Sequence, residues 1–137
     1  MAGAWRAFPL LILPAILYGM LAFAMGDEGM RQSMATIAIS LRLPSGAEWM
    51  ANRGHLILFF SAFMLFLEML KATRATTTTM VENALALLAF SVALGFFLLV
   101  PAFGTMEFFL IMSMMLIDFM ASAVVMMFVS RRDVAYL

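Results

Sequence analysis

The chain has 137 residues, of which 66% are hydrophobic and 12% charged, and its eight Lys and Arg balance its eight Asp and Glu. Because soluble domains carry about 45–50% apolar and about 25% charged residues, this composition excludes an ordinary water-soluble domain. The balanced charge, without a run of one sign, gives no reason to expect a nucleic-acid partner, and the absence of Cys excludes disulfides, thiolate metal sites and Cys nucleophiles.

Four apolar segments are long enough to cross a lipid bilayer, which takes roughly 20 residues of helix. They cover residues 5–26, 53–72, 81–103 and 105–130. We therefore expect an all-α membrane protein with a single domain over residues 1–137, built as a bundle of four transmembrane helices. Pro14 lies inside the first segment, where its missing backbone N–H should bend the helix.

The distribution of Lys and Arg around these segments predicts the orientation of the chain. One side of the membrane carries five such residues and the other carries three, and cytoplasmic flanks are the richer in Lys and Arg. The five are Arg6, Lys71, Arg74, Arg131 and Arg132, and the three are Arg31, Arg42 and Arg53. We therefore expect both termini on the cytoplasmic side and residues 27–52 in an outer loop.

The outer loop contains a segment, residues 36–43, in which apolar and polar residues alternate strictly. This period of two predicts a short β-strand, which ends at a Pro-Ser-Gly turn. No second segment alternates well enough to be its evident mate. The strand could pair with a neighbouring protomer or a partner subunit, or lie flat at the headgroups with its aliphatic face in lipid. That face consists of Ile37, Ile39, Leu41 and Leu43, and Trp49 nearby suits an interfacial anchor in either case.

Asp118 is the one acidic residue near the middle of the last span. A charge at that depth costs about 2.5–3.5 kcal/mol, and such residues are candidates for function. Ser91 lies at similar depth in the third span, so we expect a hydrogen bond between the two side chains. We expect Asp118 to be protonated, or paired with a group of another subunit. A polar clamp between helices is favoured over a proton or cation relay, because no partner acid is evident.

The other polar side chains at the span ends are expected to be structural. Glu68 and Lys71 are three residues apart near the end of the second span and should pair at the membrane interface. Thr79 and Glu82 form a capping-box pattern at the start of the third span. His55, the only His, should form interfacial hydrogen bonds, and a haem held by two His of one chain is excluded.

No motif for catalysis or for a cofactor is present. The chain lacks the serine-hydrolase elbow, the zinc-protease helix motif, the P-loop and the dinucleotide fingerprint. Met30 and Met34 are a single, weak hint of a Cu(I) site. We expect neither an enzyme nor a bound metal or cofactor. Small residues four apart predict helix contact faces, and these pairs are Ala15 with Gly19, Ala22 with Gly26, and Ser91 with Gly95.

The second half of the chain resembles small four-helix inner-membrane proteins of alphaproteobacteria for which no activity is known. The resemblance is carried by residues 68–74, the Thr-rich segment, Val81-Glu82-Asn83 and two hydrophobic spans with Asp118 in the second, together with residues 43–49. It implies a location in a bacterial inner membrane and a shared architecture. It transfers no functional residue.

Two hypotheses for function follow. The first is a non-enzymatic integral membrane subunit that oligomerises with itself or joins a larger membrane complex as an accessory subunit, using the outer-loop strand and the small-residue faces as contacts. The alternative is a small oligomeric transporter or channel in which Asp118 is the proton-responsive or cation-responsive carboxylate. Small multidrug transporters also have four helices, but their essential carboxylate lies in the first helix, and the first span here contains no acid.

Overall fold

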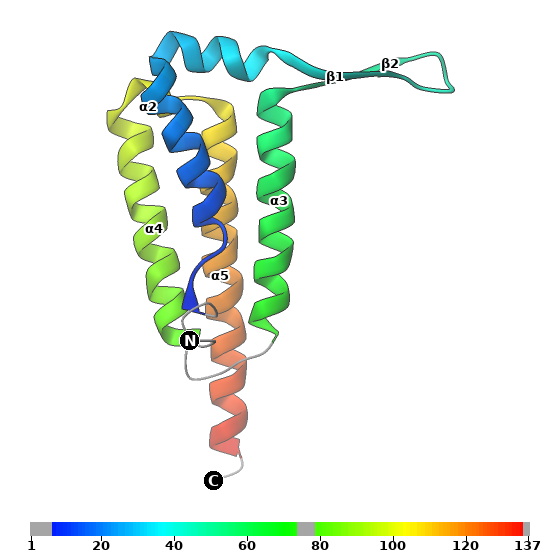
Figure 1. Ribbon diagram of the computed structural model, residues 1–137. Helices are drawn as coiled ribbons and strands as arrows, with labels where there is room; N and C mark the ends of the chain where they lie inside the picture. The colour runs from blue at the N-terminus through cyan, green and yellow to red at the C-terminus, as the bar shows by residue number, and fades with distance from the viewer. Residues whose placement is uncertain (1–6, 74–78, 136–137) are drawn as a thin grey trace.

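The computed structural model describes residues 7–73 and 79–135 of the chain. Its elements in chain order are α2 (Ile12–Ala35), β1 (Ile37–Arg42), β2 (Glu48–Asn52), α3 (Arg53–Ala72), α4 (Thr79–Leu99), the short 3-10 helix η1 (Pro101–Phe103) and α5 (Met106–Ala135). The first part of α2 lies beside α3, α4 and α5 in a bundle, and the β1–β2 hairpin extends sideways from one end (Figure 1). We call this end the hairpin end and the opposite one, where α3 stops and α4 starts, the α3–α4 end.

Three of the described helices are long and apolar enough to cross a membrane. They are Arg53–Ala72 in α3, Met80–Leu99 in α4 and Met106–Arg132 in α5, with mean hydropathies of 1.7, 1.9 and 2.2. Large apolar side chains on them face outward, for example Phe59 and Leu99, which are 76% and 82% exposed. Water penalises such a surface and lipid accommodates it. These helices agree with the second, third and fourth expected spans.

The first expected span, residues 5–26, is not a continuous apolar helix in the described part of the chain. Helix α2 begins only at Ile12, after a turn in which the Pro9 carbonyl accepts the Ile12 N–H at 3.2 Å. Pro14 is therefore the third residue of the helix, where the N–H that it lacks would have no partner within the helix. The expected bend at Pro14 is absent, and α2 is not among the helices apolar enough to span.

The bend in α2 occurs at Gly26 instead. This residue has φ +71° and ψ −176°, a backbone conformation that is essentially open only to Gly. After it, the rest of α2 turns across the hairpin end of the bundle (Figure 1). Met30 and Met34, one turn apart, are buried there, while Asp27 and Arg31 are exposed and form an ion pair of 2.9 Å. The Met side chains therefore close the bundle as apolar packing.

The predicted strand exists, but its mate belongs to the same chain. β1 pairs antiparallel with β2, with Leu41 opposite Trp49 and Arg42 opposite Glu48. The expected turn lies between them, and Gly46 adopts φ +87°, which favours Gly. The expectation that the chain holds no mate for this strand was wrong. The sequence hid β2 because it reads Glu-Trp-Met-Ala-Asn, which does not alternate between apolar and polar residues.

Aromatic packing fills the hairpin end of the bundle. The rings of Tyr18 and Phe108 are 5.0 Å apart between centroids, and those of Phe103 and Phe108 are 4.9 Å apart. The buried Tyr18 hydroxyl hydrogen-bonds with Thr105 Oγ1 and donates to the Ala102 carbonyl at 3.3 Å. These contacts join α2 to η1 and to the start of α5, so the described bundle is apolar and closely packed at this end.

Helix α3 starts with a capping box. The Asn52 side chain accepts the His55 N–H at 2.8 Å, and His55 Nδ1 accepts the Asn52 N–H at 3.3 Å. His55 is exposed at the end of the bundle, where a polar interfacial role was expected. The capping box expected at Thr79 and Glu82 lies outside the described residues, because the Thr79 side chain is not among them.

Candidate functional site

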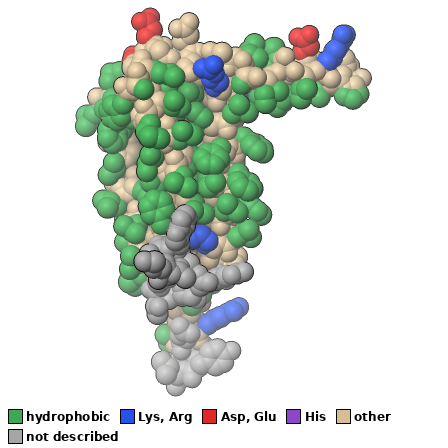
Figure 2. Space-filling view, viewed as in Figure 1, with side chains coloured by type: hydrophobic (Ala, Val, Ile, Leu, Met, Phe, Trp, Pro, Cys, Tyr) green, Lys and Arg blue, Asp and Glu red, His purple; other side chains and the backbone are tan. Residues whose placement is uncertain are grey.

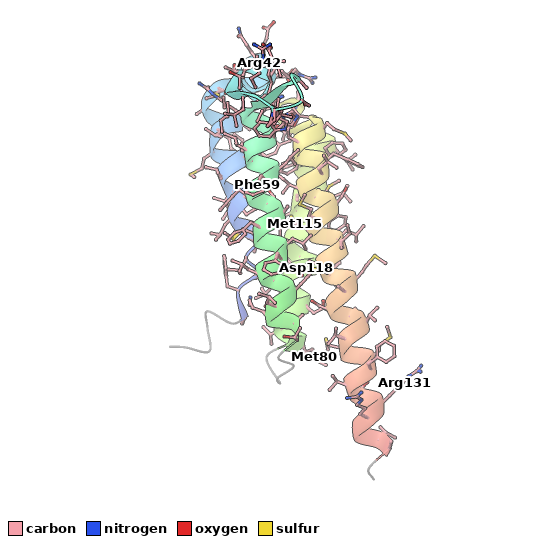
Figure 3. All side chains as sticks on the ribbon, turned by 90° about the vertical axis from the view of Figure 1, so that its right-hand side faces the viewer. Arg42, Phe59, Met80, Met115, Asp118 and Arg131 are labelled. Atoms are coloured by element: carbon pink, nitrogen blue, oxygen red, sulfur yellow. The ribbon has the colours of Figure 1, made fainter. Side chains whose placement is uncertain are left out.

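Ionisable side chains from three helices meet inside the bundle near the α3–α4 end. We call Glu68 and Lys71 of α3, Glu82 of α4 and Asp118 of α5 the acid–lysine cluster. Glu68 and Asp118 are each only 3% exposed, whereas the side chains of Lys71 and Glu82 are 23% and 18% exposed. Figure 3 shows Asp118 between the levels of Phe59 and Met80, away from the hairpin.

Lys71 contacts two of the three acids of the cluster. Its Nζ lies 3.3 Å from Glu68 Oε1 and 2.6 Å from Glu82 Oε1, and it donates a hydrogen bond to the Phe8 carbonyl at 2.9 Å. The expected pair of Glu68 and Lys71 is thus present. The lysine also links α3 to α4 and to the segment that precedes α2, two contacts that the spacing within one helix did not indicate.

Glu68 also contacts the segment that precedes α2, through the carboxylate oxygen that does not contact Lys71. Its Oε2 accepts the Leu10 N–H at 2.8 Å. Leu10 precedes the first residue of α2, so its N–H has no carbonyl partner within that helix. The buried carboxylate accepts this hydrogen bond. Together with the Lys71 bond to Phe8, it connects the segment that precedes α2 to helix α3. Glu68 is therefore a buried structural acid, although its position near a helix end suggested an interfacial one.

Asp118 has fewer partners than Glu68. Its Oδ1 atom is buried and accepts no hydrogen bond from the described residues. The same holds on α4 for Oδ1 of Asn83 and for Oε1 of Glu82, although Lys71 Nζ lies 2.6 Å from the latter. The expected partner, Ser91, is exposed and donates to the Leu87 carbonyl at 2.8 Å instead. The inward face of α4 is marked by the buried Ala93, and Ser91 lies about 200° around the helix from it. The expected hydrogen bond of Ser91 to Asp118 is therefore wrong.

The cluster carries more acid than base among the described residues. The charged groups that act on Asp118 are Glu68, Glu82 and Lys71, so full ionisation would leave three carboxylates with one ammonium. Charge that is not balanced is expensive inside a membrane protein. In the described part of the chain no group of three or more His, Cys, Asp or Glu could hold a metal ion.

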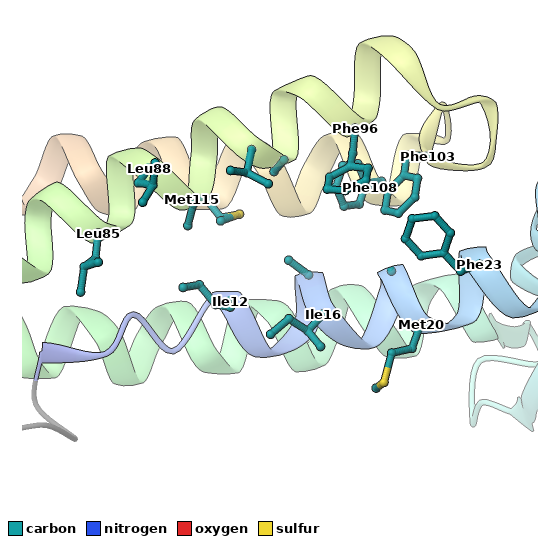
Figure 4. A pocket seen from close by; sticks show the side chains of 15 residues that line it. Ile12, Ile16, Met20, Phe23, Leu85, Leu88, Phe96, Phe103, Phe108 and Met115 are labelled. Atoms are coloured by element: carbon teal, nitrogen blue, oxygen red, sulfur yellow. The ribbon is translucent and has the colours of Figure 1, made fainter.

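A second feature is an apolar groove of about 730 Å³ between α2 and α4, floored by α5 and η1. Figure 4 shows side chains from both helices facing it, with Ile12 and Ile16 on α2 and Leu85 and Leu88 on α4. Ala15 and Gly19, one of the expected small-residue pairs, also line it. The groove offers no polar group for chemistry, and its lining suits apolar chains.

The third feature is the apolar face of the hairpin. Ile39, Leu41, Leu43 and Trp49 are between 40% and 56% exposed. The expected place of Ile37 on this face is not supported, because the pairing of β1 with β2 shifts register between Ile37 and Ile39. Figure 2 shows hydrophobic side chains along the side of the hairpin that is turned toward the level of the helices, with charged side chains toward the opposite side and the tip. The hairpin is thus amphipathic. Ala51, which lies opposite Ile39 on the apolar face, is only 3% exposed, so the described chain covers this face near the bundle and leaves its outer part exposed.

The sequence indicated Asp118, Glu68, Lys71 and the hairpin row, but not the contact of Glu82 with Lys71. The capping-box pattern predicts a helix-capping role for Glu82, and its position in the first turn of α4 gives no sign of a partner on α3. Comparison with protein families, with curated proteins and with solved structures found no match to this chain.

Proposed function

We propose that the protein is a non-enzymatic integral membrane subunit that assembles with copies of itself through its hairpin. The observation that carries the proposal is the apolar face of β1 and β2, which stands clear of the chain's own helices (Figure 1). An apolar strip rimmed by charge is typical of an interaction surface. A two-stranded hairpin is also marginally stable alone, so a covering surface would stabilise it.

A second copy offers a matching surface at the same end of the molecule. Leu98, Leu99 and Met106, where α4 and α5 meet η1, are 68%, 82% and 64% exposed. The hairpin leaves the bundle on the α3 side, whereas α4 lies on the opposite side (Figure 1). The hairpin of one copy would therefore lie over the ends of α4 and α5 of the next. Such head-to-tail contacts close into a ring when the rotation between copies permits.

The proposal places the assembly in a bacterial inner membrane with the α3–α4 end in the cytoplasm. The balance of Lys and Arg around the spans supports this orientation. Three spanning helices and the segment of residues 7–26 beside them would bring both described ends of the chain to that side. A larger membrane complex, with this chain as an accessory subunit, would use the same hairpin face.

The test exploits the absence of Cys from the chain. The double variant Leu41→Cys with Leu99→Cys is oxidised in native membranes. We expect a ladder of disulfide-linked oligomers, because each hairpin would reach the next copy. The matched control pairs Leu99→Cys with Ser40→Cys, which places the thiol on the opposite hairpin face and should give little ladder.

The opposite result would be a double variant that forms no ladder and whose Leu41→Cys thiol reacts with a lipid-soluble reagent. The apolar face would then lie in lipid at the headgroups, and the assembly proposal would be wrong. Crosslinks to a different protein would instead replace self-assembly by a hetero-complex.

A second candidate function, a small oligomeric transporter or channel, is favoured by Asp118 and its buried Oδ1. The aromatic packing around Tyr18 fills the hairpin end of a single chain, so a transport path would run between copies. Flux of protons or cations into liposomes containing the protein should then be lost in Asp118→Asn. Equal flux with and without the substitution would eliminate this function.

A further inference from the structure

The acid–lysine cluster distributes its hydrogen-bond donors unequally. Glu68 receives the Leu10 N–H and the Lys71 ammonium, and Glu82 is 2.6 Å from the same ammonium. Asp118, which is as buried as Glu68, has an oxygen without a donor from the described residues. A buried acceptor that lacks a donor costs about 1–3 kcal/mol, and more when it is charged.

The groups that face Asp118 cannot balance its charge. Lys71 is the one described cation among them, and it already contacts two carboxylates and the Phe8 carbonyl. Glu68 from α3 and Glu82 from α4 add charge of the same sign as an ionised Asp118. The described segment before α2 contributes only backbone groups at this point, Phe8 and Leu10.

A proton provides what this arrangement lacks. Bound to Asp118, it removes one negative charge and turns an acceptor into a donor. Two further buried acceptors without a hydrogen-bond donor among the described residues, Asn83 Oδ1 and Glu82 Oε1, lie on the neighbouring α4. Glu68 receives two donors and Glu82 contacts the Lys71 ammonium, whereas Oδ1 of Asp118 has no donor among the described residues. Asp118 is therefore the member of the cluster on which the proton is held.

We infer that Asp118 is a proton-binding site that exchanges its proton with the aqueous phase at the α3–α4 end. The side chains of Lys71 and Glu82 beside it are partly exposed at that end. Toward the hairpin end, Ile111 and Phe108 are buried and apolar. The buried Tyr18 hydroxyl there is already hydrogen-bonded to Thr105 and to the Ala102 carbonyl. The inference concerns proton binding alone, so it rests on neither the assembly nor the transport proposed above.

The first test uses the unmodified protein in liposomes and dicyclohexylcarbodiimide, an apolar reagent for protonated carboxyl groups. The acid gives its proton to a nitrogen of the reagent while its oxygen adds to the central carbon, and rearrangement leaves a stable N-acylurea on the side chain. We expect the adduct on Asp118 at neutral pH, and loss of the adduct as the pH is raised. Glu68 is the matched internal control, because it is equally buried but ion-paired.

An adduct on Glu68 or Glu82 without one on Asp118 would overturn the inference. Infrared spectroscopy decides the case in which the reagent reaches no carboxyl. A protonated buried acid gives a carbonyl band separate from that of carboxylates, and we expect this band in the wild type and its loss in Asp118→Asn. The control Glu28→Gln, which removes an exposed acid at the hairpin end, should retain the band. A wild-type protein without the band at neutral pH would show Asp118 to be ionised and the inference to be wrong.

Discussion

Replacing Gly26 by Ala should strain the backbone at the bend of α2. The residue has φ +71° and ψ −176°, and a Cβ added there would meet no atom within 4 Å. The cost is therefore conformational and not steric crowding by neighbours. A non-Gly residue in such a region costs about 1–3 kcal/mol, which corresponds to a change of about 5-fold to 150-fold in the unfolding equilibrium constant.

Gly95→Ala is the matched control. Gly95 lies within α4, and an added Cβ there also meets nothing within 4 Å. In a helix interior Ala is favoured over Gly by up to about 1 kcal/mol, so the two substitutions should act in opposite directions. The assay is the free energy of unfolding in mixed micelles, titrated with sodium dodecyl sulfate and followed by circular dichroism.

Equal effects of the two substitutions would refute the reasoning, because the bend would then not depend on the left-handed conformation of Gly26. A variant that keeps its stability by straightening α2 can also be recognised. Met30 and Met34 are 0% and 3% exposed, and they would lose their cover if residues 27–35 left the end of the bundle. Their oxidation by peroxide would become faster, which mass spectrometry measures directly.

Three further substitutions test contacts at the hairpin end by the same unfolding assay. Tyr18→Phe removes a buried hydroxyl bonded to Thr105 and should destabilise by about 1–2 kcal/mol; an unchanged free energy of unfolding would show that this hydrogen bond contributes nothing. Asn52→Ala removes the cap of α3 and should cost about 1 kcal/mol, whereas a stable variant would argue against the capping box. Gly54→Ala would place a Cβ 2.7 Å from Glu107 Oε1, so it should destabilise, and adding Glu107→Ala should restore stability; simple additivity in this double-mutant cycle would contradict the close approach.

The long apolar helices were predictable because hydropathy and length set the requirement for crossing a bilayer. The three helices that are long and apolar enough to cross a membrane, in α3, α4 and α5, follow from that rule. The start of α2 does not, because Pro9 permits either a first helical turn or the turn that it forms before Ile12. The bend at Gly26 was not predictable either, because Ala22 and Gly26, four residues apart, also fit the pattern of a helix contact face.

The candidate site was predictable residue by residue but not as a cluster. Burial of Asp118 followed from its place in an apolar span, and the pair of Glu68 and Lys71 followed from their spacing. Which side of α4 faces inward depends on packing, and this placed Ser91 on the surface and brought Glu82 to Lys71. Contacts between helices far apart in sequence need the fold, because no local periodicity encodes them.

The hairpin shows the limits of alternation as a signal. β1 alternates and was expected, but β2 is specified by the tight turn at residues 44–46 and by pairing with β1. Trp49 was expected to be an interfacial anchor, and it lies directly opposite Leu41 on the exposed apolar face. A strand that reads poorly alone can thus be fixed by its neighbour.

Self-assembly through the hairpin is the central claim, and the mass of the gently solubilised native particle tests it most directly. Native mass spectrometry should give a whole-number multiple of the 15.2 kDa chain with no other protein, and deleting the hairpin residues 37–52 should reduce that mass to the single chain. A wild-type particle that is already a single chain, or one whose mass is unaffected by the deletion, would contradict the account.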